Sequence, residues 1–161
     1  MGKRADSLAQ RLEEGAAALA RFAEKLSDAE WRTRLPGDGR MVGVVVHHVA
    51  DVYPLEVQIA QTVASGKPIA GVTWTAVAEM NAKHAADNAA IEKTAALEHL
   101  KRNSKTAAEA VRKFTDQELD TVAAVSLNGD APLTAQFVLE DHAVRHSFHH
   151  LAKMRAAVGH D

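Results

Sequence analysis

The segment DHAVRHSFHH, residues 141–150, places His142, His146 and His150 four residues apart, and His149 follows His146 by three. Side chains three or four positions apart on an α-helix lie on one face, so a helical backbone gathers all four imidazoles within about a quarter turn. Imidazoles on adjacent turns can chelate one metal ion. The segment therefore predicts a helix whose histidine face binds a metal, with His146 and His150 as two ligands.

A second histidine pair lies in the segment VVVHHVAD, residues 44–51. Two imidazoles are seldom a complete metal site, so a third ligand has to come from another helix that faces the same interior. His48 lies on the apolar stripe that continues to Val52, whereas His47 aligns with Asp51 on a more polar side. We therefore expect His48 to point inward as the third ligand.

The apolar spacing around these two segments predicts four long helices. Hydrophobic residues recur at three- and four-residue intervals, and clusters of Gly, Pro and Asn separate the helical stretches. Short capped turns are expected at 27–30 and 115–118, and Pro54 is expected to kink the second helix. The predicted helices cover residues 7–26, 40–65, 74–114 and 133–158, with a break possible inside the third.

The composition favours a single all-α domain that spans residues 1–161. Apolar residues make up 47% of the chain, enough for a sizeable core, and aromatic residues only 4%, which suits helices better than strands. No repeat or low-complexity tract divides the chain. The simplest architecture is an antiparallel, up-and-down four-helix bundle, with the order of its connections left open.

Charge and residue usage exclude several functional classes. A formal net charge of −2 provides no basic surface for nucleic acid. No uninterrupted apolar stretch of about 18 residues and no apolar signal core are present, so we expect no membrane partner and a cytoplasmic location. The chain has no cysteine, so any thiol chemistry requires a thiol from outside.

The roles of the remaining polar residues stay open at this stage. His47, His84, His99 and His160 are expected to be ordinary surface or satisfied core histidines. His142 and His149 could support the ligands or face a substrate. The carboxylates that could accept the second N–H of a ligating imidazole are Asp51, Glu140 and Asp141. Tyr53 and Glu56 could reach the same end of the bundle, and no general acid or base is assigned.

The two histidine motifs resemble those of the DinB/YfiT-like metal-binding four-helix bundles. In that family an apolar-apolar-His-His motif in the second helix contributes one ligand, and His-x-x-His-His in the last helix contributes two. Residues 45–51 and 146–150 reproduce these motifs in the same order, and the resemblance covers nearly the whole chain. It implies a histidine triad of His48, His146 and His150.

The chain departs from the family pattern at two places. Family members often have a tryptophan shortly before the helix-two motif, where this chain has GRMV at residues 39–42. They also often have an Arg-Gly-Gln-like run after the last histidine, where this chain has LAK at residues 151–153. These differences bear on the substrate more than on the metal.

The resemblance implies an enzyme as well as a fold. Three imidazoles suit a divalent ion, of which zinc and nickel are the best candidates, and they leave a coordination position open for chemistry. Characterised relatives imply a metal-dependent transferase or isomerase that acts on a small-molecule substrate with a low-molecular-weight thiol, and a homodimer.

Two other classes of bundle were compared with this pattern. A di-iron carboxylate bundle requires Glu-x-x-His pairs, and no glutamate here has a histidine three residues later. The alternative that stays open is a non-enzymatic dimeric bundle, with a structural metal or none, that acts as a stress-response or binding module. A pocket and an exchangeable ligand beside the metal would distinguish the enzyme from this alternative.

Overall fold

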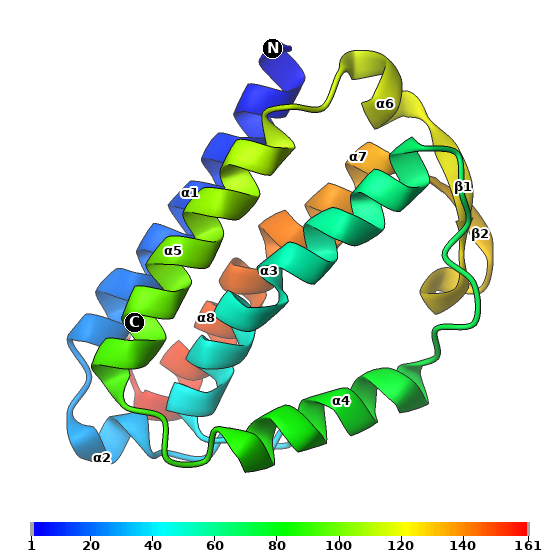
Figure 1. Ribbon diagram of the computed structural model, residues 1–161. Coiled ribbons are helices and arrows are strands. Elements are labelled where there is room, and N and C mark those ends of the chain that lie inside the picture. The colour runs from blue at the N-terminus through cyan, green and yellow to red at the C-terminus, as the bar shows by residue number, and fades with distance from the viewer. Residues whose placement is uncertain (1, 161) are drawn as a thin grey trace.

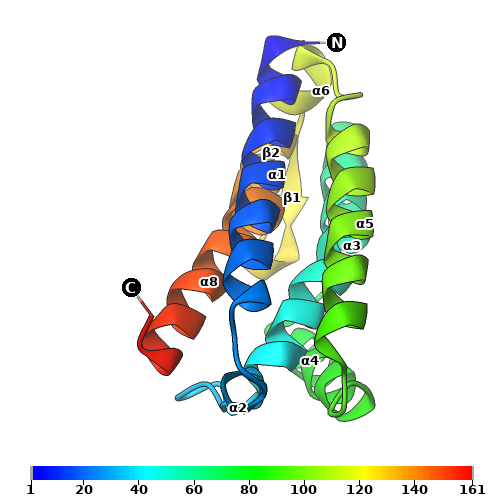
Figure 2. The ribbon, with the colours of Figure 1, turned by 90° about the vertical axis from the view of Figure 1, so that its left-hand side faces the viewer.

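Four long helical segments pack side by side in the computed structural model, which describes residues 2–160 (Figure 1). They are α1 (Lys3–Glu24), α3 (Val42–Ala64), α5 (Lys93–Val111) and a continuous C-terminal segment that consists of α7 (Ala135–Val138), the π-helical turn η2 (Leu139–Val144) and α8 (Arg145–Val158). The four-helix bundle predicted from the sequence is confirmed. In Figure 2, α1 lies between α5 and α8.

The directions of the helices depart at one place from the antiparallel, up-and-down order that the sequence favoured as the simplest. α1 and α3 run in opposite directions, as do α5 and the C-terminal segment, whereas α3 and α5 point the same way (Figure 1). Near the middle of this parallel pair, the Asn103 amide of α5 donates to the Ala50 carbonyl of α3 at 2.9 Å. Two consecutive bundle helices can be parallel here because the chain between them returns to the opposite end of the bundle.

A separate helix, α4 (Trp74–Asp87), makes that return and divides the predicted helix of residues 74–114 in two. Thr73 caps its N-terminus, as its sequence predicted. At its other end the Asn88 side chain donates to the His84 carbonyl at 2.9 Å, which satisfies a terminal acceptor and ends the helix. No residue of α4 is buried, so α4 lies on the outside of the bundle (Figure 1).

A small hairpin precedes the C-terminal helical segment. The strands β1 (Val122–Val125) and β2 (Ala131–Thr134) pair antiparallel, with Val122 opposite Thr134. The sequence predicted a loop at 127–132 and a helix from 133. The helix begins two residues later because the Thr134 side chain caps it, and four-residue strands are too short for a periodic signal.

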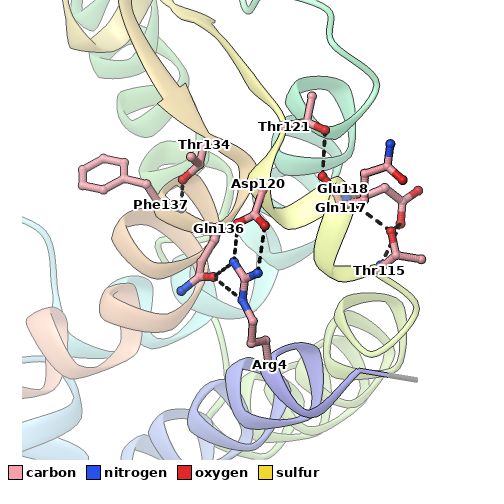
Figure 3. Close-up of polar contacts among 9 residues, drawn as sticks. All are labelled: Arg4, Thr115, Gln117, Glu118, Asp120, Thr121, Thr134, Gln136 and Phe137. Carbon is pink, nitrogen blue, oxygen red and sulfur yellow. Dashed lines mark hydrogen bonds and ion pairs between the residues drawn. The ribbon is translucent and has the colours of Figure 1, made fainter.

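The end of the bundle where α1 begins is closed by the short helix α6 (Asp116–Asp120). Its capping box between Thr115 and Glu118 confirms the predicted turn. The Arg4 guanidinium donates to both carboxylate oxygens of Asp120, at 2.6 and 3.1 Å, and to Oε1 of Gln136 at 2.6 and 3.1 Å (Figure 3). One side chain of α1 thus joins α6 to α7.

The core fills the space between the four bundle segments. Its largest fully buried side chains include Tyr53, Leu12, Leu19, Leu100, Leu139 and Met154. Within residues 2–160, no helix combines the length and the apolar composition that crossing a bilayer requires. The apolar residues serve instead to pack the helices against one another.

Close packing of an indole ring against a glycine of the backbone fixes the start of α3. The short helix α2 (Asp28–Trp31) has the predicted capping box at Ser27, and its Trp31 is buried against Gly43 of α3. A Cβ at position 43 would lie 2.3 Å from the indole ring. The Trp31 indole N–H also donates to the Ile91 carbonyl at 3.0 Å, so the ring cannot withdraw without breaking this bond.

Gly43→Ala should therefore lower the free energy of unfolding by about 1–2 kcal/mol, because the overlap outweighs the helix propensity that alanine adds. Urea unfolding followed by circular dichroism measures the change. In the Trp31→Leu background the same substitution should cost little, since the ring is gone. An equal loss in both backgrounds would contradict the proposed contact.

Candidate metal centre

The three histidines predicted as ligands meet between α3 and α8. His48 of α3 and His146 and His150 of α8 each offer a ring nitrogen, and these nitrogens lie within 4.8 Å of one another. The ring centroid of His48 lies 5.1 Å from that of His146 and 5.6 Å from that of His150. His48 and His150 are only 5% and 6% exposed. In residues 2–160 this is the one cluster of three or more such side chains with that spacing.

A buried carboxylate fixes the orientation of one ligand. Oε1 of Glu56 forms a hydrogen bond with Nδ1 of His146. Since Nδ1 donates to the carboxylate, Nε2 keeps its lone pair and is free to bind a cation. Glu56 is itself buried. This carboxylate–imidazole pair is the arrangement that surrounds most metal-bound histidines, and it supports the assignment of the triad.

Glu56 was the partner that the sequence analysis left without a role. The three carboxylates favoured there have other partners: Asp51 pairs with His99 at 3.1 Å, Glu140 with Arg11 at 2.9 Å and Asp141 with Arg145 at 3.1 Å. Glu56 follows His48 by eight residues, two turns along the same apolar face. The sequence signal that could have identified Glu56 is its charge on an apolar face, since a buried charge requires a partner.

Burial controls the protonation of the triad. It lowers the pKa of His48 from 6.5 to about 3 and that of His150 from 6.5 to about 2, with the nearby His146 as the next cause. Both rings are therefore neutral near pH 7, and their lone pairs are available. Nδ1 of His150 and Oε2 of Glu56 are both buried, and neither has a hydrogen-bond partner within residues 2–160. Two buried, neutral imidazoles beside the Glu56–His146 pair fit a divalent cation.

A cavity of about 340 Å³ lies beside the triad. One wall is apolar and comes from α3 and α4, with Val52, Leu55, Ile59, Trp74, Val77 and Met80. The polar side includes Arg40, Arg145, Lys153, His142 and His149. The two histidines whose roles were open thus line the cavity. His142 lies in the π-helical turn η2, one turn before His146, and is not among the three histidines whose ring nitrogens come together.

The histidines expected to be ordinary form contacts of their own. Nδ1 of His47 lies 2.8 Å from Nε2 of His84, which links α3 to α4, and the His47 ring also lies against that of His99 on α5. At the other side of the bundle, His160 pairs with Glu30 at 2.7 Å. The His84 ring also lies edge-on against the ligand His48, with 5.6 Å between the centroids, so the contact between α3 and α4 adjoins the triad.

Comparisons with known proteins identify the family and the fold. The family model of the DinB superfamily matches residues 11–154, which include all three predicted ligands. A solved structure with a similar fold is described as "YfiT from Bacillus subtilis is a probable metal-dependent hydrolase with an unusual four-helix bundle topology". Its TM-score is 0.76 at 23% identity, and the alignment covers 100% of this chain and 91% of that one. No curated protein matches.

Glu56→Gln should weaken zinc binding by roughly 10- to 100-fold, because an amide holds the His146 ring less firmly and leaves it less basic. Competition with a chromophoric chelator measures the affinity. Glu140→Gln is the matched control, since Glu140 pairs with Arg11 away from the triad. Equal affinities for the two variants would show that Glu56 does not support a metal ligand.

The metal-free protein should lose stability as the pH falls below about 6.5. A histidine with a lowered pKa in the folded state takes up its proton more readily when unfolded, so acid favours unfolding. His48 and His150 each contribute at most about 1.4 kcal/mol per pH unit. The raised pKa of buried Glu56 opposes this slope, so the comparison is made between variants.

Urea unfolding in the presence of a chelator, from pH 7 to pH 5, gives the slope for each protein. His48→Gln should be less steep than the wild type, because it lacks one of the buried imidazoles that take up a proton more readily on unfolding. Identical slopes for wild type and His48→Gln would count against a neutral buried His48.

Proposed function

The chain belongs to the DinB superfamily, and on that premise we propose that it is a metal-dependent enzyme with His48, His146 and His150 as the ligands. One observation carries the proposal: the triad borders a cavity of about 340 Å³, and the described residues supply no fourth ligand to the cluster. Three protein ligands beside a cavity are typical of a catalytic ion, whereas structural sites are closed by four. Zinc and nickel are the proposed ions.

We propose transfer of a low-molecular-weight thiol to a small electrophile, or isomerisation with the help of such a thiol. A bound ion supplies Lewis acidity and favours the deprotonated form of a coordinated thiol or water. In the transfer, a sulfur–carbon bond forms and the bond to the leaving group breaks; in the isomerisation the thiol departs again. The chain lacks cysteine, so the thiol has to be a cosubstrate.

The residues of the chain contribute binding and orientation. Glu56 holds the His146 ring in one orientation, and Leu55, Trp74 and Met80 provide an apolar wall against which a substrate can pack. Reduced thiols accumulate in the cytoplasm, where we place the enzyme, and we propose that it acts as a homodimer.

A second candidate activity is hydrolysis. YfiT is described as a probable metal-dependent hydrolase, and the same open coordination position would serve a water molecule as well as a thiol. The two reactions differ only in the nucleophile, so a single set of assays separates them.

Protein purified without a histidine tag should contain close to one equivalent of zinc or nickel, and His48→Ala and His150→Ala should lose it while remaining folded by circular dichroism. The zinc- and nickel-loaded proteins are then assayed with 1-chloro-2,4-dinitrobenzene and a panel of low-molecular-weight thiols. Thiol-dependent turnover that His150→Ala abolishes supports the transferase.

The other outcomes discriminate between the alternatives. Cleavage of an activated ester without any thiol, again lost in His150→Ala, would favour the hydrolase. A tightly bound ion that exchanges no small ligand and supports neither reaction would indicate the non-enzymatic bundle. No metal uptake from zinc or nickel solutions would refute the metalloenzyme altogether.

A further inference from the structure

A charged side chain that the proposed reaction does not yet use lies beside the triad. Arg40 precedes α3, in the stretch 39–42 where the chain departs from the motif of the family that it resembles. It lines the same cavity as the three ligands, yet its side chain is only 15% exposed. A charge with so little access to water requires specific partners.

Asp38 accepts hydrogen bonds from two of the three guanidinium nitrogens of Arg40 and fixes the orientation of the group. Nε of Arg40 donates to Oδ1 of Asp38 at 2.6 Å, and Nη2 donates to Oδ2 at 2.7 Å. Two parallel hydrogen bonds orient the planar group more firmly than a single contact can. The pairing lowers the pKa of Asp38, so its carboxylate stays charged.

The remaining nitrogen, Nη1, is buried and has no hydrogen-bond partner among the described residues. A guanidinium nitrogen carries two N–H donors, and leaving them unpaired inside a protein costs free energy. Such an atom calls for an acceptor that the chain itself does not supply. Because Arg40 lines the cavity, a small turn of the guanidinium toward it would let an oxygen of a bound ligand provide one.

Arg40 also acts on the triad directly. Burial and the neighbouring His146 are the largest causes of the lowered pKa of His48, and the positive charge of Arg40 is the next. The same charge lowers the pKa of His150. Arg40 and the three ligands also line one cavity, so an anion held by Arg40 would lie in the cavity that the metal site borders.

The other cations of the cavity are placed differently. Arg145 pairs with Asp141, and its side chain is 59% exposed. Lys153 is exposed as well. Water screens charges at such exposed positions, so they discriminate less between an anion and a neutral group.

We propose that Arg40 is an anion-binding residue of this site that recognises the carboxylate of an organic acid, whose apolar body lies against Trp74, Val77 and Met80 of α4. A carboxylate matches a partly buried guanidinium in charge and in hydrogen bonding. Trp74 and Met80 are exposed apolar side chains that a hydrophobic ligand would cover. The assignment deepens the proposed function and rests on it, because it takes this cavity as the substrate site.

The test compares two ligands that differ only in charge, 3-phenylpropionate and its neutral amide, 3-phenylpropionamide. Isothermal titration calorimetry gives the affinity of each for the zinc-loaded and the metal-free protein. The wild type should bind the carboxylate at least about tenfold more tightly than the amide, as expected for a charge-assisted contact. The preference should persist without zinc, because it comes from Arg40.

Arg40→Gln should abolish the preference and leave binding of the amide unchanged, since the amide uses only the apolar wall. Arg40→Lys keeps the positive charge next to Asp38 but loses the two parallel hydrogen bonds of the guanidinium, so it should retain only part of the preference. It also serves as a second test if the glutamine variant does not fold. Lys153→Gln is the matched control and should keep the full preference.

Several results would overturn the proposal. The first two are a preference for the carboxylate that Arg40→Gln leaves undiminished and one that Lys153→Gln removes instead. The third is equal affinity of the wild type for the two ligands. The fourth is a preference that exists only with zinc, which would assign the carboxylate to the metal. Metal uptake and thiol-dependent turnover are measured separately. A failure of the proposed function is therefore seen independently of the role of Arg40.

Discussion

The hydrogen bond between Glu56 and His146 is the interaction on which the site depends. It joins α3 to α8 at the point where His48 and His150 also meet, so the same contact packs two helices and orients a metal ligand. A carboxylate and three imidazoles inside a bundle have lost their water and need one another or a cation. The polar cluster therefore restricts how α8 can slide or rotate against α3.

The parallel arrangement of α3 and α5 determines what the site faces. In a bundle whose helices alternate strictly, a short loop would connect these two helices and the cavity would lack its second apolar wall. Here the chain returns through α4, which contributes Trp74, Val77 and Met80. None of the residues of α4 is buried, so its position depends on few contacts, among them that of His84 with His47. The topology thus supplies a wall that a ligand can cover.

Periodicity predicted the parts of the molecule that depend on regular helices. Two patterns were sufficient to predict that the three side chains meet: the four-residue spacing of His146 and His150, and the apolar stripe that contains His48. The same spacing placed His142 and His149 on that helix face, and both line the cavity beside the triad. It predicted a break inside residues 74–114 only as possible, because helical spacing alone does not locate the boundary between α4 and α5. Glu56 and Arg40 were missed as partners because their roles depend on contacts between segments distant in sequence.

The triad shows why a cation would matter to folding as well as to chemistry. Burial lowers the pKa of His48 and His150 far below that of an exposed imidazole, so their environment disfavours the protonated form. The positive charge of Arg40 lowers both values further and would also repel a metal ion. Two carboxylates reduce this repulsion, because Asp38 offsets the guanidinium charge and Glu56 contributes a negative charge. Three neutral nitrogens replace the hydration of the ion, and an anionic ligand would complete the balance of charge. On this argument the metal and the substrate carboxylate stabilise each other, and each would bind more weakly alone.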